Sequence, residues 1–332
     1  MGRDPEYLKS VLRAHLVSGD KITGIRQLAA GHTNETYLVE GLNQILRMPP
    51  AGAPLLDSFD MWKQFQLYAV VKGLPGGPPV PRVTYYCDDL SVLGAPFFLM
   101  GAAPGEPFPE YECDPWLAEA SPDFRGNISR QWVEAIGGLA NQEPIEMLGP
   151  IRSPQEEMHI WRRYSVDAGN DALTTQIDRL LAMNPKRSGP PAVVHGDPKL
   201  GNTLWNDGKL SVLLDWEMSS NGEPLNDLGY MLYFFASESH PFYSPNCDLP
   251  GLWGREQIIA GWQAVTGRPV EGILWYEAMS AAKITAIMAY GHHLALTGQT
   301  DDQRMHNWEP YVLAGVEMTQ IMTDAIDRSG EA

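Results

Sequence analysis

Residues 193–217 read VVHGDPKLGNTLWNDGKLSVLLDWE, and this stretch decides the fold. An apolar start leads into a polar loop, and two apolar segments, residues 203–205 and 210–214, follow it. Asp207 and Gly208 stand between these segments. An Asp-Gly pair flanked by apolar runs is a strong signal for a hairpin turn. The stretch therefore predicts a polar loop that leads into a β-hairpin.

The open end of this hairpin gathers oxygen-bearing side chains. Pairing outward from the turn places Asn202 opposite roughly Leu213, and Asp215 follows at the same end. Asp197 precedes Asn202 in the loop that leads to this end. Carboxamide and carboxylate oxygens suit Mg²⁺, and an Asp with an Asn and a second Asp is the set that phosphoryl transfer uses. The pattern favours a phosphotransferase.

The first third of the chain predicts a small β-rich lobe. Apolar residues at helical spacing predict a helix over residues 5–17. Short apolar runs separated by turns predict three antiparallel strands within residues 21–47. A helix is expected over residues 58–72, and two further strands are expected over residues 82–87 and 95–100.

The rest of the chain predicts a large helical lobe, so that the fold class is α+β. A flexible Gly- and Pro-containing joint, residues 101–105, separates the two parts. The helices expected after it cover residues 129–141, 155–168, 171–183, 255–266, 272–297 and 307–327. We therefore expect an N-terminal helix within residues 1–20, a nucleotide-binding lobe over 21–100, and a helical lobe over 101–328 with the catalytic loop and the metal-binding hairpin.

Composition limits the classes of partner. The chain has 332 residues, with 24 Lys and Arg against 41 Asp and Glu, which gives a net charge of −17. Such an acidic surface repels nucleic acid and anionic membranes and weakly attracts cations. The most apolar stretch, residues 278–296, is interrupted by Lys283, His292 and His293. We expect no nucleic-acid partner, no membrane partner and a cytoplasmic location.

The motifs within residues 193–230 carry a family resemblance. The loop HGDPKLGN, residues 195–202, resembles the catalytic loop of the aminoglycoside phosphotransferase and choline kinase family. Residues 214–217 look like the metal-binding segment of that family. The longer run 215–230 is similar to a narrower branch, the kinase-like domains fused or adjacent to acyl-CoA dehydrogenases. The resemblance covers roughly residues 20–325 and implies a protein-kinase-like, two-lobed fold.

The resemblance also implies roles for single residues. Asp197 would be the catalytic base, and Asn202 and Asp215 would be the Mg²⁺ ligands. His195 would brace the loop, and Lys199 would contact the transferring phosphate.

Two acidic residues after the hairpin receive different expectations. By the resemblance, Asp227 would be a structural carboxylate that ties the catalytic loop to a helix. Glu217 is expected to be a surface or salt-bridging residue and not a catalytic group.

The nucleotide side rests on weaker patterns. Protein kinases pair a strand lysine with a glutamate on the next helix. At the corresponding positions this chain has Arg47 and Gln64. A loop between two expected strands resembles the phosphate-covering loop, and main-chain groups near residue 100 would line an adenine pocket. The expected nucleotide-binding residues are Gly31, Thr33, Asn34, Arg47, Met100 and Ala102.

The sequence leaves the acceptor open. The donor would be ATP or GTP with Mg²⁺, and the acceptor a hydroxyacyl compound, another metabolite or an aminoglycoside-like antibiotic. A nucleotide-binding pseudokinase that regulates a partner protein is the alternative, favoured by the missing helix glutamate. A protein kinase is disfavoured because no APE-type segment follows Asp215, and a metal-dependent hydrolase because no extra ligands lie near Asp197. Candidates for the acceptor wall are Trp161, Arg162, Arg163, Tyr230, Trp275, Tyr276, His292, His293 and Trp308.

Overall fold

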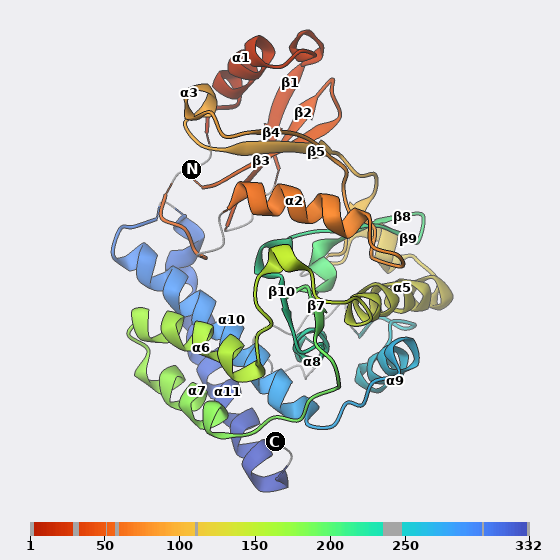
Figure 1. Ribbon diagram of the computed structural model, residues 1–332, viewed down its shortest axis with the longest axis vertical. Helices are drawn as coiled ribbons and strands as arrows, with labels where there is room; N and C mark the ends of the chain where they lie inside the picture. The colour runs from red at the N-terminus through yellow and green to blue at the C-terminus, as the bar shows by residue number, and fades with distance from the viewer. Residues whose placement is uncertain are drawn as a thin grey trace.

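The computed structural model describes residues 3–28, 33–50, 52–56, 60–109, 112–234, 248–300 and 302–330. A β-sheet from the N-terminal part stands above a mostly helical remainder (Figure 1). The predicted α+β class, with strands first and helices after them, is therefore confirmed. Within the described ranges, no helix is both long enough and apolar enough to cross a membrane.

The N-terminal sheet has five antiparallel strands in the order β1-β2-β3-β5-β4. The strands are β1 Gly24–Gln27, β2 Glu35–Glu40, β3 Gln44–Met48, β4 Val83–Cys87 and β5 Phe97–Gly101. Successive side chains of a strand point to opposite faces. In β5, Phe97 and Leu99 belong to one core cluster, whereas Phe98 and Met100 belong to another.

Each face of this sheet has its own helix. Helix α1 (Pro5–His15) packs Leu8 and Leu12 into the cluster that contains Phe97, and the short α3 (Leu90–Leu93) adds Leu93 to it. Helix α2 (Met61–Lys72) packs Leu67 and Tyr68 on the opposite face, with Phe98. Helix α2 begins after Asp60, whose carboxylate accepts the backbone N–H of Lys63 at 3.0 Å. The predicted start at residue 58 falls on residues outside the described ranges.

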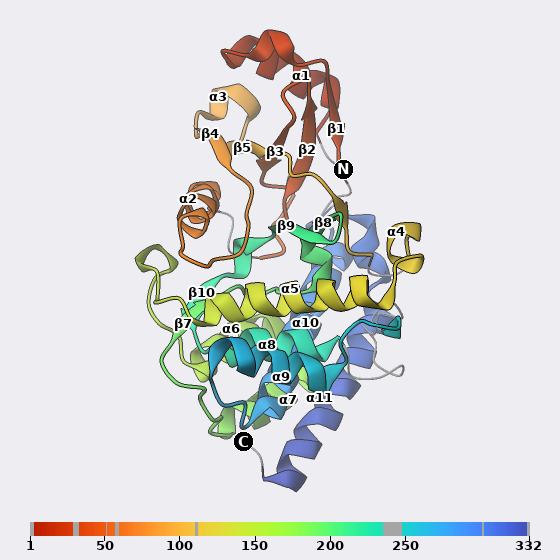
Figure 2. The ribbon, with the colours of Figure 1, turned by 90° about the vertical axis from the view of Figure 1, so that its right-hand side faces the viewer.

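The helical remainder lies below the sheet and α2 (Figures 1 and 2). Its helices are α4 Pro115–Ala118, α5 Pro122–Ala140, α6 Pro154–Asp167, α7 Asp171–Ala182, α8 Leu225–Tyr233, α9 Arg255–Thr266, α10 Ile273–Leu296 and α11 Glu309–Ser329. Helix α5 starts before the predicted residue 129, because Ser121 caps it by accepting the Phe124 N–H at 3.2 Å and Pro122 occupies the first turn.

Helix α8 packs closely against α10 at a glycine. A Cβ atom at Gly229 would lie 2.6 Å from the carbonyl carbon of Tyr276. We expect Gly229→Ala to lower the free energy of unfolding by about 1–3 kcal/mol, the usual cost of overpacking. The control is Gly73→Ala at the end of α2. Gly73 has a helical φ of −90°, and a Cβ atom there would lie 3.4 Å from its nearest neighbour, Val70 O. Denaturant unfolding should separate the two variants, and an equal loss in both would contradict the close packing.

The predicted hairpin is present between the sheet and α5 (Figure 2). Strands β8 (Thr203–Asn206) and β9 (Lys209–Leu213) pair around the predicted two-residue turn. A register irregularity at Leu204 and Trp205 shifts the far end, so Thr203 and not Asn202 lies opposite Leu213. The predicted partner of Asn202 was therefore wrong by one residue, because Asn202 O accepts the N–H of Leu214 at 2.8 Å.

Two short pairings complete the strands around the hairpin. Strand β6 (Glu106–Pro107) pairs with β8, and β7 (Ala192–Val194) pairs with β10 (Ser220–Gly222). Strand β7 ends where the polar loop begins, and β10 follows the segment after Asp215. The loop and that segment are thereby held side by side.

Candidate active site

The loop of residues 195–202 is anchored by a buried carboxylate. Asp227, in α8, is 3% exposed and accepts the backbone N–H groups of His195 at 2.7 Å and Gly196 at 2.8 Å. Burial raises the pKa of Asp227 to about 6, although these two N–H groups oppose the shift. The tie between the loop and a helix, which the resemblance implies, is present.

His195 is a neutral brace inside this loop. Its side chain is fully buried, and burial lowers the pKa of His195 to about 4. Nδ1 accepts the backbone N–H of Asp197 at 3.2 Å, which assigns the proton to Nε2, and Nε2 donates to Leu214 O at 2.9 Å. The imidazole thus links the loop to the end of β9, next to Asp215.

This burial makes stability pH-dependent. The pKa of His195 is about 4 in the folded chain, against 6.5 for a free imidazole. The unfolded chain therefore binds the proton first, and stability present above pH 6.5 is lost as the pH falls through 4. The wild type should lose unfolding free energy between pH 7 and pH 4, and about 3 kcal/mol of that loss comes from His195, at 1.36 kcal/mol per pKa unit. In His195→Gln this part of the loss should be absent.

The measurement is denaturant unfolding at a series of pH values. His159→Gln is the matched control, because the His159 side chain is exposed on α6. The control should follow the wild-type profile. A His195→Gln profile parallel to the wild type would contradict the lowered pKa, because it would show that His195 has the same pKa in the folded and unfolded chains.

Asp197 has one oxygen held and the other without a partner. Asn202 Nδ2 donates to Asp197 Oδ2 at 2.7 Å and to Asp197 O at 2.9 Å. Asp197 Oδ1 is buried and has no hydrogen-bond partner among the described residues. A buried acceptor without a partner costs about 1–3 kcal/mol, so Asp197 Oδ1 is an acceptor for which the described residues supply no donor.

Asp215 stands at the open end of the hairpin in a left-handed conformation, with φ +60°. Its Oδ1 lies 2.7 Å from Arg47 Nη1 on β3, across the space between sheet and hairpin. Burial raises the pKa of Asp215, but the Arg47 charge outweighs this effect and lowers the pKa below its ordinary value. Lys199 lowers it further, so Asp215 is a carboxylate at neutral pH.

Asp215 and Asn202 fit a magnesium ion that is coordinated partly by the protein and partly by nucleotide phosphates. Among the described residues, no cluster of three or more His, Cys, Asp and Glu side chains could hold a metal ion alone. Asp215 offers an ionised carboxylate, and Asn202 offers its carbonyl oxygen because its Nδ2 is bonded to Asp197. One or two protein oxygens completed by phosphate and water is the usual Mg²⁺ arrangement.

Arg47, one of the residues expected to bind the nucleotide, is buried and makes two ion pairs. Its side chain is 6% exposed, and Nη2 lies 3.0 Å from Glu217 Oε2. Burial lowers the pKa of Arg47, but the charge of Asp215, with Tyr68 and Glu217, raises it well above its usual range, so Arg47 is always a cation. Its Nε is buried with no partner in the described part of the chain. This unused donor suits a phosphate oxygen.

Glu217 joins the predicted phosphate loop to Arg47. Its Oε1 accepts from Thr33 Oγ1 at 2.5 Å, and its Oε2 accepts from Asn34 Nδ2 at 2.6 Å. Burial raises the pKa of Glu217 to about 6. The predicted salt-bridging role is confirmed, but a surface position was wrong because the side chain is only 8% exposed. No local pattern reveals this role, since its partners lie some 170 residues earlier.

The remaining predicted nucleotide-binding residues are placed unevenly. Gly31 lies outside the described residues. Met100 is buried in the sheet between Ile45 and Val83, and Ala102 donates its N–H to Asn43 O at 3.1 Å. The Ala102 N–H is therefore already used, and only its carbonyl group remains as a main-chain contact.

Lys283 supports the loop from the other side and was not predicted as a site residue. It is 4% exposed in α10, and its Nζ donates to Gly196 O at 2.5 Å. Nζ also lies 4.8 Å from the ring centre of Trp161 and 5.3 Å from that of Tyr230. Burial lowers the pKa of Lys283. A lysine inside an otherwise apolar helical run was the sequence signal for this contact.

The proposed acceptor wall is only partly assembled. Trp161 and Tyr230 meet at Lys283, beside the 195–202 loop. Trp161 and Tyr230 are themselves buried, and Trp275 and Tyr276 are fully buried core residues. Arg162 is exposed and pairs with Asp178 at 2.6 Å.

Sequence comparisons identify long relatives, among them a mouse and a rat protein. The mouse protein "Acyl-CoA dehydrogenase family member 10" is 26% identical over 313 residues, which cover 89% of this chain and 28% of the relative. The rat protein "Acyl-CoA dehydrogenase family member 11" is 27% identical over an alignment of 359 positions that covers 99% of this chain and 45% of the relative. The chain thus spans less than half the length of these relatives.

Solved structures share the fold at low identity. A Ralstonia eutropha protein described as an aminoglycoside phosphotransferase superposes with a TM-score of 0.73 at 19% identity, covering 96% of this chain and 98% of its own. The GDP complex of aminoglycoside 2'-phosphotransferase-IIIa gives 0.64 at 16%, covering 97% and 99%. An ADP-bound aminoglycoside phosphotransferase, APH(2'')-Ib, gives 0.58 at 14%, covering 94% and 97%. The predicted kinase-like fold is confirmed.

The family model described as "Phosphotransferase enzyme family" matches residues 24–259. This segment contains the five-stranded sheet, the 195–202 loop and the hairpin with Asp215. The chain therefore belongs to the phosphotransferase enzyme family.

Proposed function

We propose that this phosphotransferase is a small-molecule kinase that moves the γ-phosphoryl group of a Mg-nucleotide onto a substrate hydroxyl, with Asp197 as the base. The observation that carries the proposal is the Asp197 carboxylate. Asn202 holds one of its oxygens, and the other is buried without a partner. A hydroxyl donor at that oxygen would complete the site and be aligned for proton transfer.

The chain's own groups suit each part of the transfer. The acceptor hydroxyl gives its proton to Asp197 Oδ1 while its oxygen forms a bond to the γ-phosphorus and the nucleoside diphosphate leaves. Arg47 would grip the phosphates, with its Nε as an unused donor. Asp215 and Asn202 would hold Mg²⁺, which neutralises phosphate charge when it is bound. Lys199 would approach the transferred group.

The donor nucleotide would be ATP or GTP. Neighbours with this fold were solved as GDP and ADP complexes, which supports a nucleotide between β3 and the hairpin and leaves both bases as candidates. Main-chain recognition by the Met100 to Ala102 segment would decide between the two bases.

We propose a hydroxylated acyl compound or a related metabolite as the acceptor. Both long relatives carry the name acyl-CoA dehydrogenase family member. Lys283, Trp161 and Tyr230 are buried beside the loop, at 4%, 4% and 6% exposed, so they support the loop, and the choice of acceptor rests on the relatives. The net charge of −17 favours a polycation such as an aminoglycoside, but it acts over the whole surface.

A nucleotide-binding pseudokinase that regulates a partner is the second candidate. The observation in its favour is Gln64, which stands where protein kinases have the helix glutamate and is buried at 5% exposure. Asp197, Asn202 and Asp215 are all present, and this favours the active enzyme.

The experiment is Mg²⁺-dependent turnover of ATP and GTP against aminoglycosides, macrolides, amino alcohols and hydroxyacyl-CoA esters. The proposal expects turnover with hydroxyacyl esters and its loss in Asp197→Asn. Turnover with aminoglycosides alone would retain the kinase and replace the acceptor. Nucleotide binding without turnover on any acceptor would favour the pseudokinase.

A further inference from the structure

Arg47, the cation on β3, forms its ion pairs with a different segment than the corresponding lysine of protein kinases. In protein kinases this cation pairs with a glutamate from the helix that follows, which here is α2. The position on α2 holds Gln64, and Asp60, the nearest acid, is used as the N-cap of the helix. The ion pairs that Arg47 makes go to Asp215 at 2.7 Å and to Glu217 at 3.0 Å, and both belong to the segment after β9.

Glu217 is bound more completely than an incidental salt bridge would be. Thr33 occupies its Oε1, and Asn34 and Arg47 share its Oε2. These donors come from the segment before β2 and from β3, so one carboxylate connects two parts of the sheet to the segment that carries Asp215. A carboxylate with charge-assisted bonds of this kind fixes the geometry of its donors.

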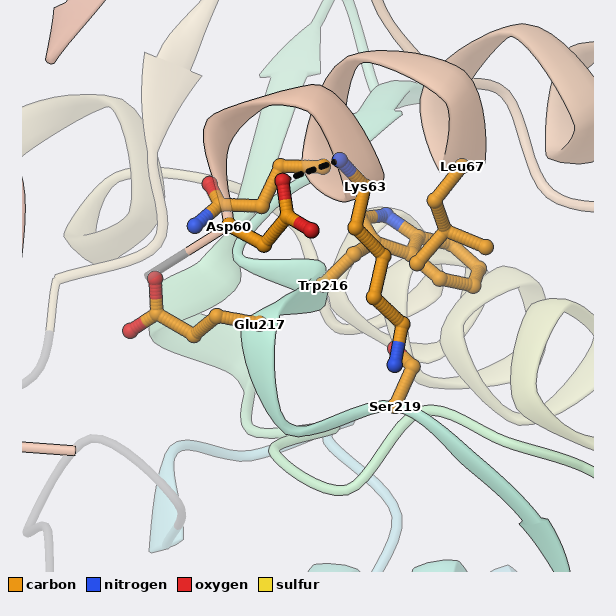
Figure 3. Close-up of a pocket in the computed structure, with 7 residues that line it drawn as sticks. Asp60, Lys63, Leu67, Trp216, Glu217 and Ser219 are labelled. Carbon is orange, nitrogen blue, oxygen red and sulfur yellow. Dashed lines mark hydrogen bonds between the residues drawn. The ribbon is translucent and has the colours of Figure 1, made fainter. Parts of the chain in front are cut away.

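Gln64 and Glu217 face the same space. A pocket of about 240 Å³ lies between α2 and residues 216–219, and both side chains line it. Leu67 and Trp216 form an apolar part of its lining, and Lys63 and Ser219 complete it with Asp60 (Figure 3). A carboxylate at position 64 would therefore enter the space beside Glu217.

We propose that Glu217 is a positioning residue that takes the place of the helix glutamate and orients Arg47 toward the nucleotide phosphates. The role deepens the proposed function and rests on it. The orientation of the Arg47 side chain would then be set by the segment that carries the proposed metal ligand Asp215, and not by α2. The arrangement of Arg47 and the metal segment would then be set together, without a movement of α2.

The test is an exchange of the two side chains. Glu217→Gln keeps the size of the side chain and removes its charge, and Gln64→Glu returns a carboxylate from α2. We expect Glu217→Gln to weaken Mg-nucleotide binding by about 10-fold to 100-fold, the range for loss of a charge-assisted bond. Gln64→Glu alone adds a second carboxylate beside Glu217 and should weaken binding, whereas the double variant, which has one carboxylate there, should recover most of the loss.

Binding of a non-hydrolysable ATP or GTP analogue to the full chain is the readout, with the KM and kcat of transfer measured in parallel. Recovery by Gln64→Glu is the result that a merely structural glutamate would not give. Unchanged binding in Glu217→Gln would overturn the proposal, as would a loss that the second change leaves intact. A loss that saturating Mg²⁺ repairs in the single variant would assign Glu217 to the metal ion instead.

The binding measurement needs no transfer step. A wild-type chain that binds the analogue but transfers nothing would defeat the kinase proposal, while the exchange would still decide the role of Glu217. Transfer in the wild type without recovery in the double variant would defeat the role of Glu217 alone.

Discussion

Replacing Asp197 with asparagine is expected to lower kcat by about 10²–10⁴-fold, the usual contribution of a positioned general base. The amide has the same shape, and its oxygen can still accept the bond from Asn202 that holds Asp197 Oδ2 at 2.7 Å. It cannot take a proton at the position of Oδ1. The loss should therefore appear in kcat, measured with the preferred acceptor at saturating nucleotide.

Nucleotide affinity separates this role from others. Asp197 makes no bond to Arg47, whose ion pairs go to Asp215 and Glu217. The Kd for the Mg-nucleotide should thus stay within about threefold of the wild type, well below the factor of ten that 1.4 kcal/mol represents. Equal losses of binding and turnover would instead assign Asp197 to the nucleotide side of the site.

Removing the charge of Asp215 is expected to abolish the effect of Mg²⁺ on nucleotide binding. Asp215→Asn should weaken the apparent Mg²⁺ affinity by at least about 10–100-fold, a loss seen even when an outer partner of a metal ligand is removed. Asparagine suits the test because it tolerates the left-handed conformation at φ +60°, so the backbone should stay in place. The measurement is nucleotide binding titrated with Mg²⁺.

The hairpin offers a matched control. Asp207 is also left-handed, with φ +49°, but it is exposed in the turn at the opposite end. Asp207→Asn removes the same charge with the same backbone tolerance and should leave the Mg²⁺ titration unchanged. An unaltered titration in Asp215→Asn, or equal effects of both changes, would rule out Asp215 as a metal ligand.

Local signals predicted the fold well. The Asp207-Gly208 turn, the alternating strands of the sheet and the apolar spacing of most helices are properties of neighbouring residues. The two errors have different causes. The hairpin irregularity at Leu204 and Trp205 depends on cross-strand packing, whereas the Ser121 cap of α5 was readable in the sequence.

The site was less predictable because it is assembled across the chain. The sequence predicted that Asp197, Asn202 and Asp215 meet, since they lie in the loop before one hairpin and at the open end of that hairpin. It did not reveal that Arg47 reaches over to Glu217, because that contact depends on how the sheet stands above the hairpin. Lys283 was seen only as an interruption of an apolar helix, and its bond to Gly196 O appears only when α10 is placed.

The most direct test of the kinase account is the fate of a labelled γ-phosphoryl group. The wild type and Asp197→Asn would be incubated in parallel with Mg²⁺, γ-labelled ATP or GTP and a pool of hydroxylated metabolites that includes hydroxyacyl-CoA esters. The account predicts a labelled phosphate ester with the wild type and none with the variant. Tight nucleotide binding with no labelled ester, or equal label with both proteins, would contradict it.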